Sequence, residues 1–160
     1  MRRSTERILT THVGSLIRPA DLQPFIRARQ SGQPYDEKAH ARCLASSVME
    51  VVKRQTEAGI DVPSDGEFGK SISWSQYALE RLSGFEKRMV KPEANPFKRG
   101  ADRARFAEFY AELDAADGPP GSAGATAPLS VCTGPIRYTG VEEIQRDIAN
   151  FKAALAAAGD

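Results

Sequence analysis

Apolar residues recur at helical spacing in residues 35–59, "YDEKAHARCLASSVMEVVKRQTEAG". The stripe consists of Leu44, Val48, Val51 and Val52. Asp36 can cap the start of this segment, and Gly59 can end it. The pattern therefore predicts a long helix with one buried face.

A second stripe of apolar residues follows in residues 139–159, with spacings of three and four residues. It consists of Val141, Ile144, Ile148, Phe151 and Leu155. Thr139 and Glu142 have the spacing of a capping box. Residues 20–32 predict a shorter helix, with Pro24 in its first turn, where proline is tolerated.

Three short segments predict strands that each precede a helix, and the helix after the second segment is predicted at residues 73–84 ("SWSQYALERLSG"). The three strand segments are residues 7–15 ("RILTTHVGS"), 60–64 ("IDVPS") and 127–136 ("APLSVCTGPI"). Strands that alternate with helices are typical of right-handed β-α-β units around a parallel sheet. We therefore expect an α/β fold of about three to four β-α units.

The segment 85–127 interrupts this alternation and reads as an insertion between the second and third β-α units. Residues 86–105 hold seven Lys or Arg against three acids. This basic stretch favours a solvated loop face over a site for an anionic co-substrate. Residues 105–115, "RFAEFYAELDA", predict a helix with aromatic side chains on one face.

Composition narrows the class of protein. The 160 residues suffice for one domain with a core, and 22 basic residues nearly balance 21 acidic ones. This balance argues against a nucleic-acid partner or an anionic membrane surface. We expect no secretion signal and no membrane span, and two free thiols at Cys43 and Cys132 in the cytoplasm.

Three predicted loops carry the candidate chemistry. In parallel sheets, ligands bind where the carboxyl ends of the strands meet. Gly14 and Ser15, the segment 64–67 ("SDGE") and the segment 133–140 ("TGPIRYTG") would then share one rim. Glycine allows close backbone approach to a ligand, and the acids would face that ligand.

At these loops the sequence resembles the cobalamin-independent methionine synthase family, both its catalytic C-terminal barrel and its shorter single-barrel relatives. The residues that carry the resemblance are 10–19 ("TTHVGSLIRP"), 54–71 ("RQTEAGIDVPSDGEFGKS"), 106–114 ("FAEFYAELD") and 131–155. The family fold is a (β/α)8 barrel, which needs roughly 200 residues or more. The resemblance therefore implies a partial TIM barrel, with 1–160 as one incomplete domain equivalent to the N-terminal half.

The family transfers a methyl group from a methyl-folate to a zinc-bound homocysteine thiolate. By resemblance, the backbone of Val13, Gly14 and Ser15, together with the Ser15 side chain, holds the amino-acid carboxylate. By the same resemblance, Glu67 binds the ammonium group. The charges suit both roles, because hydrogen-bond donors bind a carboxylate and a carboxylate binds an ammonium group. The resemblance also implies zinc, with ligands that this chain does not encode. Methyl-folate is a possible co-substrate. No catalytic residue is identified.

Structural interpretations compete at each of these positions. Ser15 could be a turn hydroxyl and Glu67 a solvated loop acid. His12 could line the pocket or be a satisfied interior histidine. Asp65 could also line the pocket, although a role in bracing its own loop is favoured. Cys132 is expected to be a buried small side chain.

Three functions stay open. The leading hypothesis is a methionine synthase-like methyltransferase that acts on a homocysteine-like thiol amino acid. The second is a relative that alkylates another thiol, for example by opening an epoxide with a coenzyme thiol. The third is a truncated, non-catalytic fragment. In each case the chain could associate with a second copy of itself or with a complementary barrel half.

Overall fold

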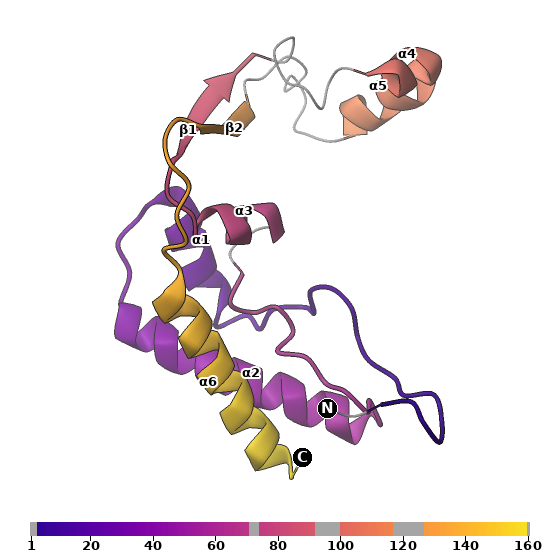
Figure 1. Cartoon of the computed structure of the whole chain (residues 1–160), viewed down its shortest axis with the longest axis vertical. Coiled ribbons are helices and arrows are strands. Elements are labelled where there is room, and N and C mark those ends of the chain that lie inside the picture. The colour runs from indigo at the N-terminus through magenta and orange to yellow at the C-terminus, as the bar shows by residue number, and fades with distance from the viewer. Residues whose placement is uncertain (1–2, 71–73, 92–99, 117–126, 160) are drawn as a thin grey trace. The chain divides into compact units, whose positions relative to one another are not determined.

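The computed structural model describes residues 3–70, 74–91, 100–116 and 127–159 (Figure 1). The chain divides into two compact units. The first unit comprises Met1–Arg81 and Tyr138–Asp160, and the second unit comprises Leu82–Arg137. The predicted insertion 85–127 lies within the second unit, and its residues 92–99 and 117–126 lie outside the described part of the chain.

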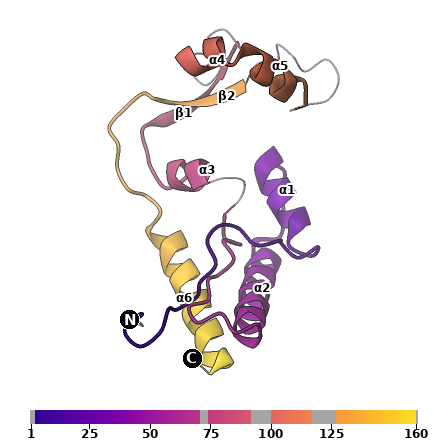
Figure 2. The same ribbon diagram turned by 90° about the vertical axis from the view of Figure 1, so that its right-hand side faces the viewer.

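The first unit contains four helices in its described residues. They are α1 (Gln23–Ser31), α2 (Glu37–Glu57), α3 (Trp74–Leu79) and α6 (Val141–Ala158). Helices α2 and α6 lie side by side (Figures 1 and 2). Their long apolar stripes explain this contact, because each helix can bury its stripe only against another element.

Both predicted ends of α2 are confirmed, and α6 ends at Gly159 as expected, but the capping box predicted at its start is wrong. The Asp36 side chain accepts a hydrogen bond of 2.9 Å from the Ala39 amide and so caps α2. The N-cap of α6 is Gly140, which makes no side-chain capping bond, so Thr139 does not form the predicted capping box. The first turn of α6 instead carries Glu142 beside its positive end.

The core of the first unit is small. Its buried apolar residues are Leu22, Leu44, Val48, Val52, Phe68 and Ala154. Three of them belong to the predicted stripe of α2, which is confirmed as the buried face. The stripe of α6 is only partly buried, since Val141 and Ile148 are exposed and Ala154 makes the deepest contact from that helix.

In its described residues, the second unit contains a two-stranded antiparallel sheet and two helices. Strand β1 (Phe85–Val90) pairs with β2 (Ala127–Cys132), with Phe85 opposite Cys132 and Val90 opposite Ala127. The helices are α4 (Ala101–Arg105) and α5 (Ala107–Ala116), and α5 matches the helix expected from the aromatic pattern.

The predicted partial TIM barrel is wrong. Within the described residues the sheet has two strands, and they are antiparallel rather than parallel. Residues 127–132 form a strand as expected, but its partner is β1, inside the segment that was interpreted as an insertion. No parallel sheet or succession of barrel-like β-α units is present in the described ranges.

The other two predicted strands, 7–15 and 60–64, meet only at one parallel bridge between Thr11 and Val62. Side chains take up much of the hydrogen bonding there. The Asp61 carboxylate accepts bonds from the Thr10 amide at 2.8 Å and the Thr10 hydroxyl at 3.0 Å. A side chain that binds neighbouring backbone competes with a strand ladder, so the two segments stay extended but do not form strands.

The two cysteines, Cys43 and Cys132, are both free thiols. Cys132 is exposed on β2, so its expected burial is wrong. Across the described helices, none combines the length and apolar character that a bilayer crossing requires.

Candidate functional site

Two loops of the first unit, 52 residues apart in sequence, meet at Ser15 and Glu67. The Ser15 hydroxyl donates a hydrogen bond of 2.6 Å to Oε2 of Glu67. The Leu16 amide donates a second bond, of 3.0 Å, to the Gly66 carbonyl. Two of the residues that were expected to bind substrate therefore lie in direct contact, tied by both side chain and backbone.

The loop that presents Glu67 is a tight turn with two successive residues in the left-handed region. Gly66 has φ +67° and Glu67 has φ +58°, which a non-glycine residue rarely adopts. A Cβ atom on Gly66 would lie 2.9 Å from the Phe68 ring, so this position requires glycine. The Asp65 carboxylate accepts a 2.9 Å bond from the Glu67 amide and so braces the turn.

Helix α2 anchors the start of this turn through Gln55, whose side chain is buried. Gln55 Nε2 donates to the Ser64 carbonyl at 2.7 Å, and its Oε1 accepts from the Ser64 amide at 2.9 Å. One amide side chain thus satisfies both backbone groups of Ser64, as the buried backbone requires. The turn is fixed to the longest helix of the unit.

Glu67 is an ionised carboxylate with both oxygens engaged. Lys70 Nζ lies 2.5 Å from Oε1, while Ser15 occupies Oε2. The hydrogen bond from Lys70, followed by that from Ser15, lowers the pKa of Glu67 below its usual range. At neutral pH the side chain is therefore an acceptor for cations and hydroxyls and has no proton to donate.

The Arg18 side chain also joins the two loops. Its Nη2 donates to the Lys70 carbonyl at 3.1 Å and to the Glu67 carbonyl at 3.4 Å. Its Nε atom is buried without a hydrogen-bond partner. The positively charged Arg18 guanidinium therefore lies within hydrogen-bonding distance of the backbone of the turn that carries Glu67.

The other expected site residues differ in their exposure to solvent. The Val13 side chain is 88% exposed, and Gly14 adopts φ +95° with open space around it. His12 is half-buried, and its Nε2 atom has no hydrogen-bond partner. Asp65 lines a cavity of about 360 Å³ that also includes Tyr77.

The third predicted loop, 133–140, makes its recorded backbone bonds to the segment 81–84. The Thr133 amide donates to the Gly84 carbonyl at 2.8 Å, and the Thr139 amide donates to the Arg81 carbonyl at 2.8 Å.

Sequence reasoning missed Lys70, Arg18 and Gln55. Lys70 could have been found, because it follows Glu67 by three residues within a turn. Arg18 lies inside the segment that carries the family resemblance, but an arginine before a proline indicates no contact by itself. Gln55 sits on the buried face of a helix, and nothing in the sequence links it to Ser64, nine residues away.

Zinc does not fit the described residues. No group of three His, Cys, Asp or Glu side chains in them is arranged to hold a metal ion. No chemical step at this site is therefore derived through zinc.

Comparison with known proteins indicates the class of protein that the chain resembles. No family model matches the chain. Partial, low-identity similarity to methionine synthases supports a methionine synthase-like relationship, weakly and over about half of the chain.

The particular relatives include the methionine synthase of Sulfolobus acidocaldarius, which is 39% identical over 77 residues, 48% of this chain and 22% of that protein. The methionine synthase of Saccharolobus islandicus strain Y.N.15.51 is 35% identical over 77 residues, again 48% of this chain and 23% of the relative. The uncharacterized protein YxjH of Bacillus subtilis is 30% identical over 103 residues, 64% of this chain and 26% of that protein. The matched stretches thus span about a quarter or less of each relative's length.

Proposed function

We propose that this chain is a methionine synthase-like protein whose Ser15–Glu67 site binds the amino-acid head of a thiol substrate such as homocysteine, for methyl transfer to that thiol. The observation that carries the proposal is the 2.6 Å contact between Ser15 and Glu67. It joins the two loops on which the resemblance to the family rests. The substrate ammonium group lies at Glu67, and the carboxylate lies on the Ser15 side.

The electrostatics of Glu67 support an ammonium ligand. The carboxylate is ionised at neutral pH, and it already holds the Lys70 ammonium group at 2.5 Å. Charge-assisted hydrogen bonds of this kind are about twice as strong as neutral ones. Because one carboxylate balances one cation, the substrate ammonium group would take the place of Lys70 at Oε1.

The rigidity of the turn also supports the proposal. Glu67 is held in the left-handed region by Gly66, by the Asp65 carboxylate and by the Gln55–Ser64 bonds. Strained backbone of this kind clusters at ligand-binding sites, where it fixes a side chain before the ligand arrives. In this proposal the described residues of the chain bind and orient the substrate.

The test is calorimetric titration of the chain with L-homocysteine. Glu67→Gln keeps the size of the side chain and removes its charge, so we expect homocysteine to bind about tenfold more weakly. Glu142→Gln, an exposed acid in the first turn of α6, is the matched control and should leave the affinity unchanged. Equal affinities for the wild type and Glu67→Gln would remove Glu67 from the site.

A further inference from the structure

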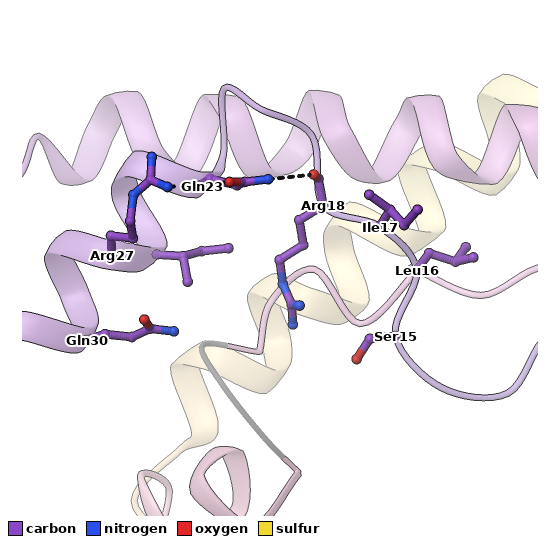
Figure 3. Close-up of a pocket in the computed structure, with 8 residues that line it drawn as sticks. Ser15, Leu16, Ile17, Arg18, Gln23, Arg27 and Gln30 are labelled. Carbon is purple, nitrogen blue, oxygen red and sulfur yellow. Dashed lines mark hydrogen bonds between the residues drawn. The ribbon is translucent and has the colours of Figure 1, made fainter. Parts of the chain in front are cut away.

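Two pockets of the first unit differ in the charge of their lining. One adjoins Ser15 and is lined by Arg18 and Arg27, whose side chains extend apart on either side of Gln23 (Figure 3). The other, the α6 pocket, is lined by residues 63–65, by Tyr77 and by four residues of α6. Its volume of about 360 Å³ is in the range of small-molecule pockets, and the described residues that line it include two acids and no basic side chain.

Helix α6 supplies the apolar wall of the α6 pocket. Ile144, Ile148 and Phe151 line it, and their spacing of four and three residues places them on one face of the helix. Ile148 is 39% exposed, so solvent reaches this wall. A ligand with an apolar body would remove that surface from water, which is favourable in proportion to the area covered.

Asp65 supplies the negative charge that has no counter-ion in the α6 pocket. In the recorded contacts of the described residues, its Oδ1 accepts one hydrogen bond, of 2.9 Å, from the Glu67 amide, and its carboxylate forms no ion pair. The second oxygen, Oδ2, therefore keeps its acceptor capacity for a donor on a ligand. The donor that binds a carboxylate most strongly is a charged one, such as an ammonium group.

Asp147, the second acid of the pocket, already has its charge balanced. Its Oδ2 accepts from Arg81 Nη2 at 3.1 Å and from the Tyr77 hydroxyl at 3.2 Å, and its Oδ1 accepts from Arg146 Nη2 at 3.1 Å. Burial, followed by the charge of Asp147, raises the pKa of Tyr77, so the phenol stays neutral at physiological pH. A ligand cation in this pocket therefore lies at Asp65, and the Tyr77 side chain is part of the wall.

We propose that the α6 pocket binds a small organic cation, with its ammonium group at Asp65 and its apolar or aromatic body against Ile144, Ile148 and Phe151. Both parts of the ligand are needed. An ion pair at a half-exposed carboxylate contributes little by itself, and the apolar contact adds to it. The site is independent of the proposed function, because neither Ser15 nor Glu67 lines the pocket.

The experiment uses three probes that separate charge from apolar surface. 2-Phenylethylammonium carries both a cation and a ring, 3-phenylpropionate reverses the charge, and ethylammonium lacks the ring. NMR titrations of the backbone amides of the full chain measure the affinity of each probe and locate its site. We expect saturable binding of 2-phenylethylammonium with signal changes at residues 63–65 and in α6, at least tenfold weaker binding of ethylammonium, and no saturable binding of 3-phenylpropionate.

Two variants test the two sides of the pocket. Asp65→Asn removes the charge but keeps an oxygen that can accept the Glu67 amide, so it should weaken 2-phenylethylammonium about fivefold. Ile148→Gln makes the wall polar and should weaken the same probe about threefold. The matched controls are Glu142→Gln and Val141→Gln, an exposed acid and an exposed apolar residue of α6 outside the lining, and both should leave the affinity unchanged.

Circular dichroism confirms that each variant is folded, and Ile148→Gln alone decides the matter if Asp65→Asn is not. The site is refuted if 2-phenylethylammonium does not bind, if 3-phenylpropionate binds equally well, or if the folded pocket variants bind the probe like the wild type. Glu67→Gln separates this site from the one proposed for the thiol substrate. A probe that is weakened by Glu67→Gln and not by Asp65→Asn lies at Glu67, which also refutes the α6 pocket, whereas homocysteine binding unaffected by Glu67→Gln refutes only the proposed function.

Discussion

Ser15 and Glu67 are 52 residues apart in sequence, and their side chains share a 2.6 Å hydrogen bond. The bond fixes a carboxylate that is ionised, accessible and already in contact with an ammonium group from Lys70. Both residues belong to the first unit, and helix α2 holds one of the two loops through Gln55.

Removal of the Ser15 hydroxyl should raise the pKa of Glu67 and destabilise the first unit by about 1 kcal/mol. The pKa of Glu67 is depressed in the folded state, so its stabilising effect is complete above its unfolded pKa and is lost as the pH falls through the folded one. Ser15→Ala should therefore flatten the acid side of the stability profile. An NMR pH titration of Glu67 measures the change in its pKa. Ser46→Ala is the control, because in the recorded contacts the Ser46 hydroxyl bonds only within its own helix.

Gly66→Ala should destabilise the protein by about 1–3 kcal/mol. The added Cβ would meet the Phe68 ring at 2.9 Å, and φ +67° is unfavourable for alanine. Gly134→Ala is the matched control, because that glycine is free of positive φ and its Cβ would meet only one atom, at 3.9 Å. Urea denaturation compares the two variants, and equal midpoints would show that the turn tolerates a side chain.

Lys70→Met should raise the pKa of Glu67 and tighten the binding of homocysteine about threefold, because the internal ammonium group no longer competes for Oε1. Lys53→Met, which removes an exposed lysine from α2, should leave the affinity unchanged. Weaker binding in Lys70→Met would mean that Lys70 helps to hold the ligand instead of occupying its place.

The ion pair between Arg81 and Asp147 is the most buried one recorded in the described residues, with side-chain exposures of 6% and 10%. Asp147 also accepts from the Tyr77 hydroxyl at 3.2 Å, and Arg81 stacks on the Tyr77 ring. Asp147→Asn leaves Arg81 as a buried charge without its counter-ion, which costs about 3–5 kcal/mol. Chemical denaturation measures this loss, whereas Glu50→Gln, in an exposed pair with Arg54, should leave the midpoint unchanged.

His40 should make the packing of α1 on α2 sensitive to pH. Its ring contacts Phe25 and Tyr35, and burial, followed by the charges of Arg146 and Arg29, lowers its pKa. A depressed pKa means that the folded state disfavours protonation, so stability falls as the pH drops below the unfolded pKa, near 6.5.

His40→Gln should remove this part of the pH dependence between about pH 7 and pH 5. NMR titration of the His40 ring gives its pKa directly. A pKa at or above the ordinary histidine value would contradict the expectation.

Several local features could be predicted because they depend on neighbouring residues in the sequence. The stripe of α2 and the cap at Asp36 are confirmed, since helical hydrogen bonds close within four residues and need no distant partner. The strand at 127–132 was also expected, within the extended segment 127–136 that precedes the last predicted helix. Its partner was not, because the same extended segment can pair with any strand that reaches it.

The sequence by itself determined the helices α1, α2, α5 and α6, the turn residues around Gly66 and the loops that carry the resemblance to methionine synthases. Only the tertiary structure decided that residues 7–15 and 60–64 share a single bridge, and that β1 and β2 are antiparallel. It also decided that Lys70 and Arg18 surround Glu67. Contacts between residues far apart in sequence depend on which segments pack together, and local propensity carries no information about that choice.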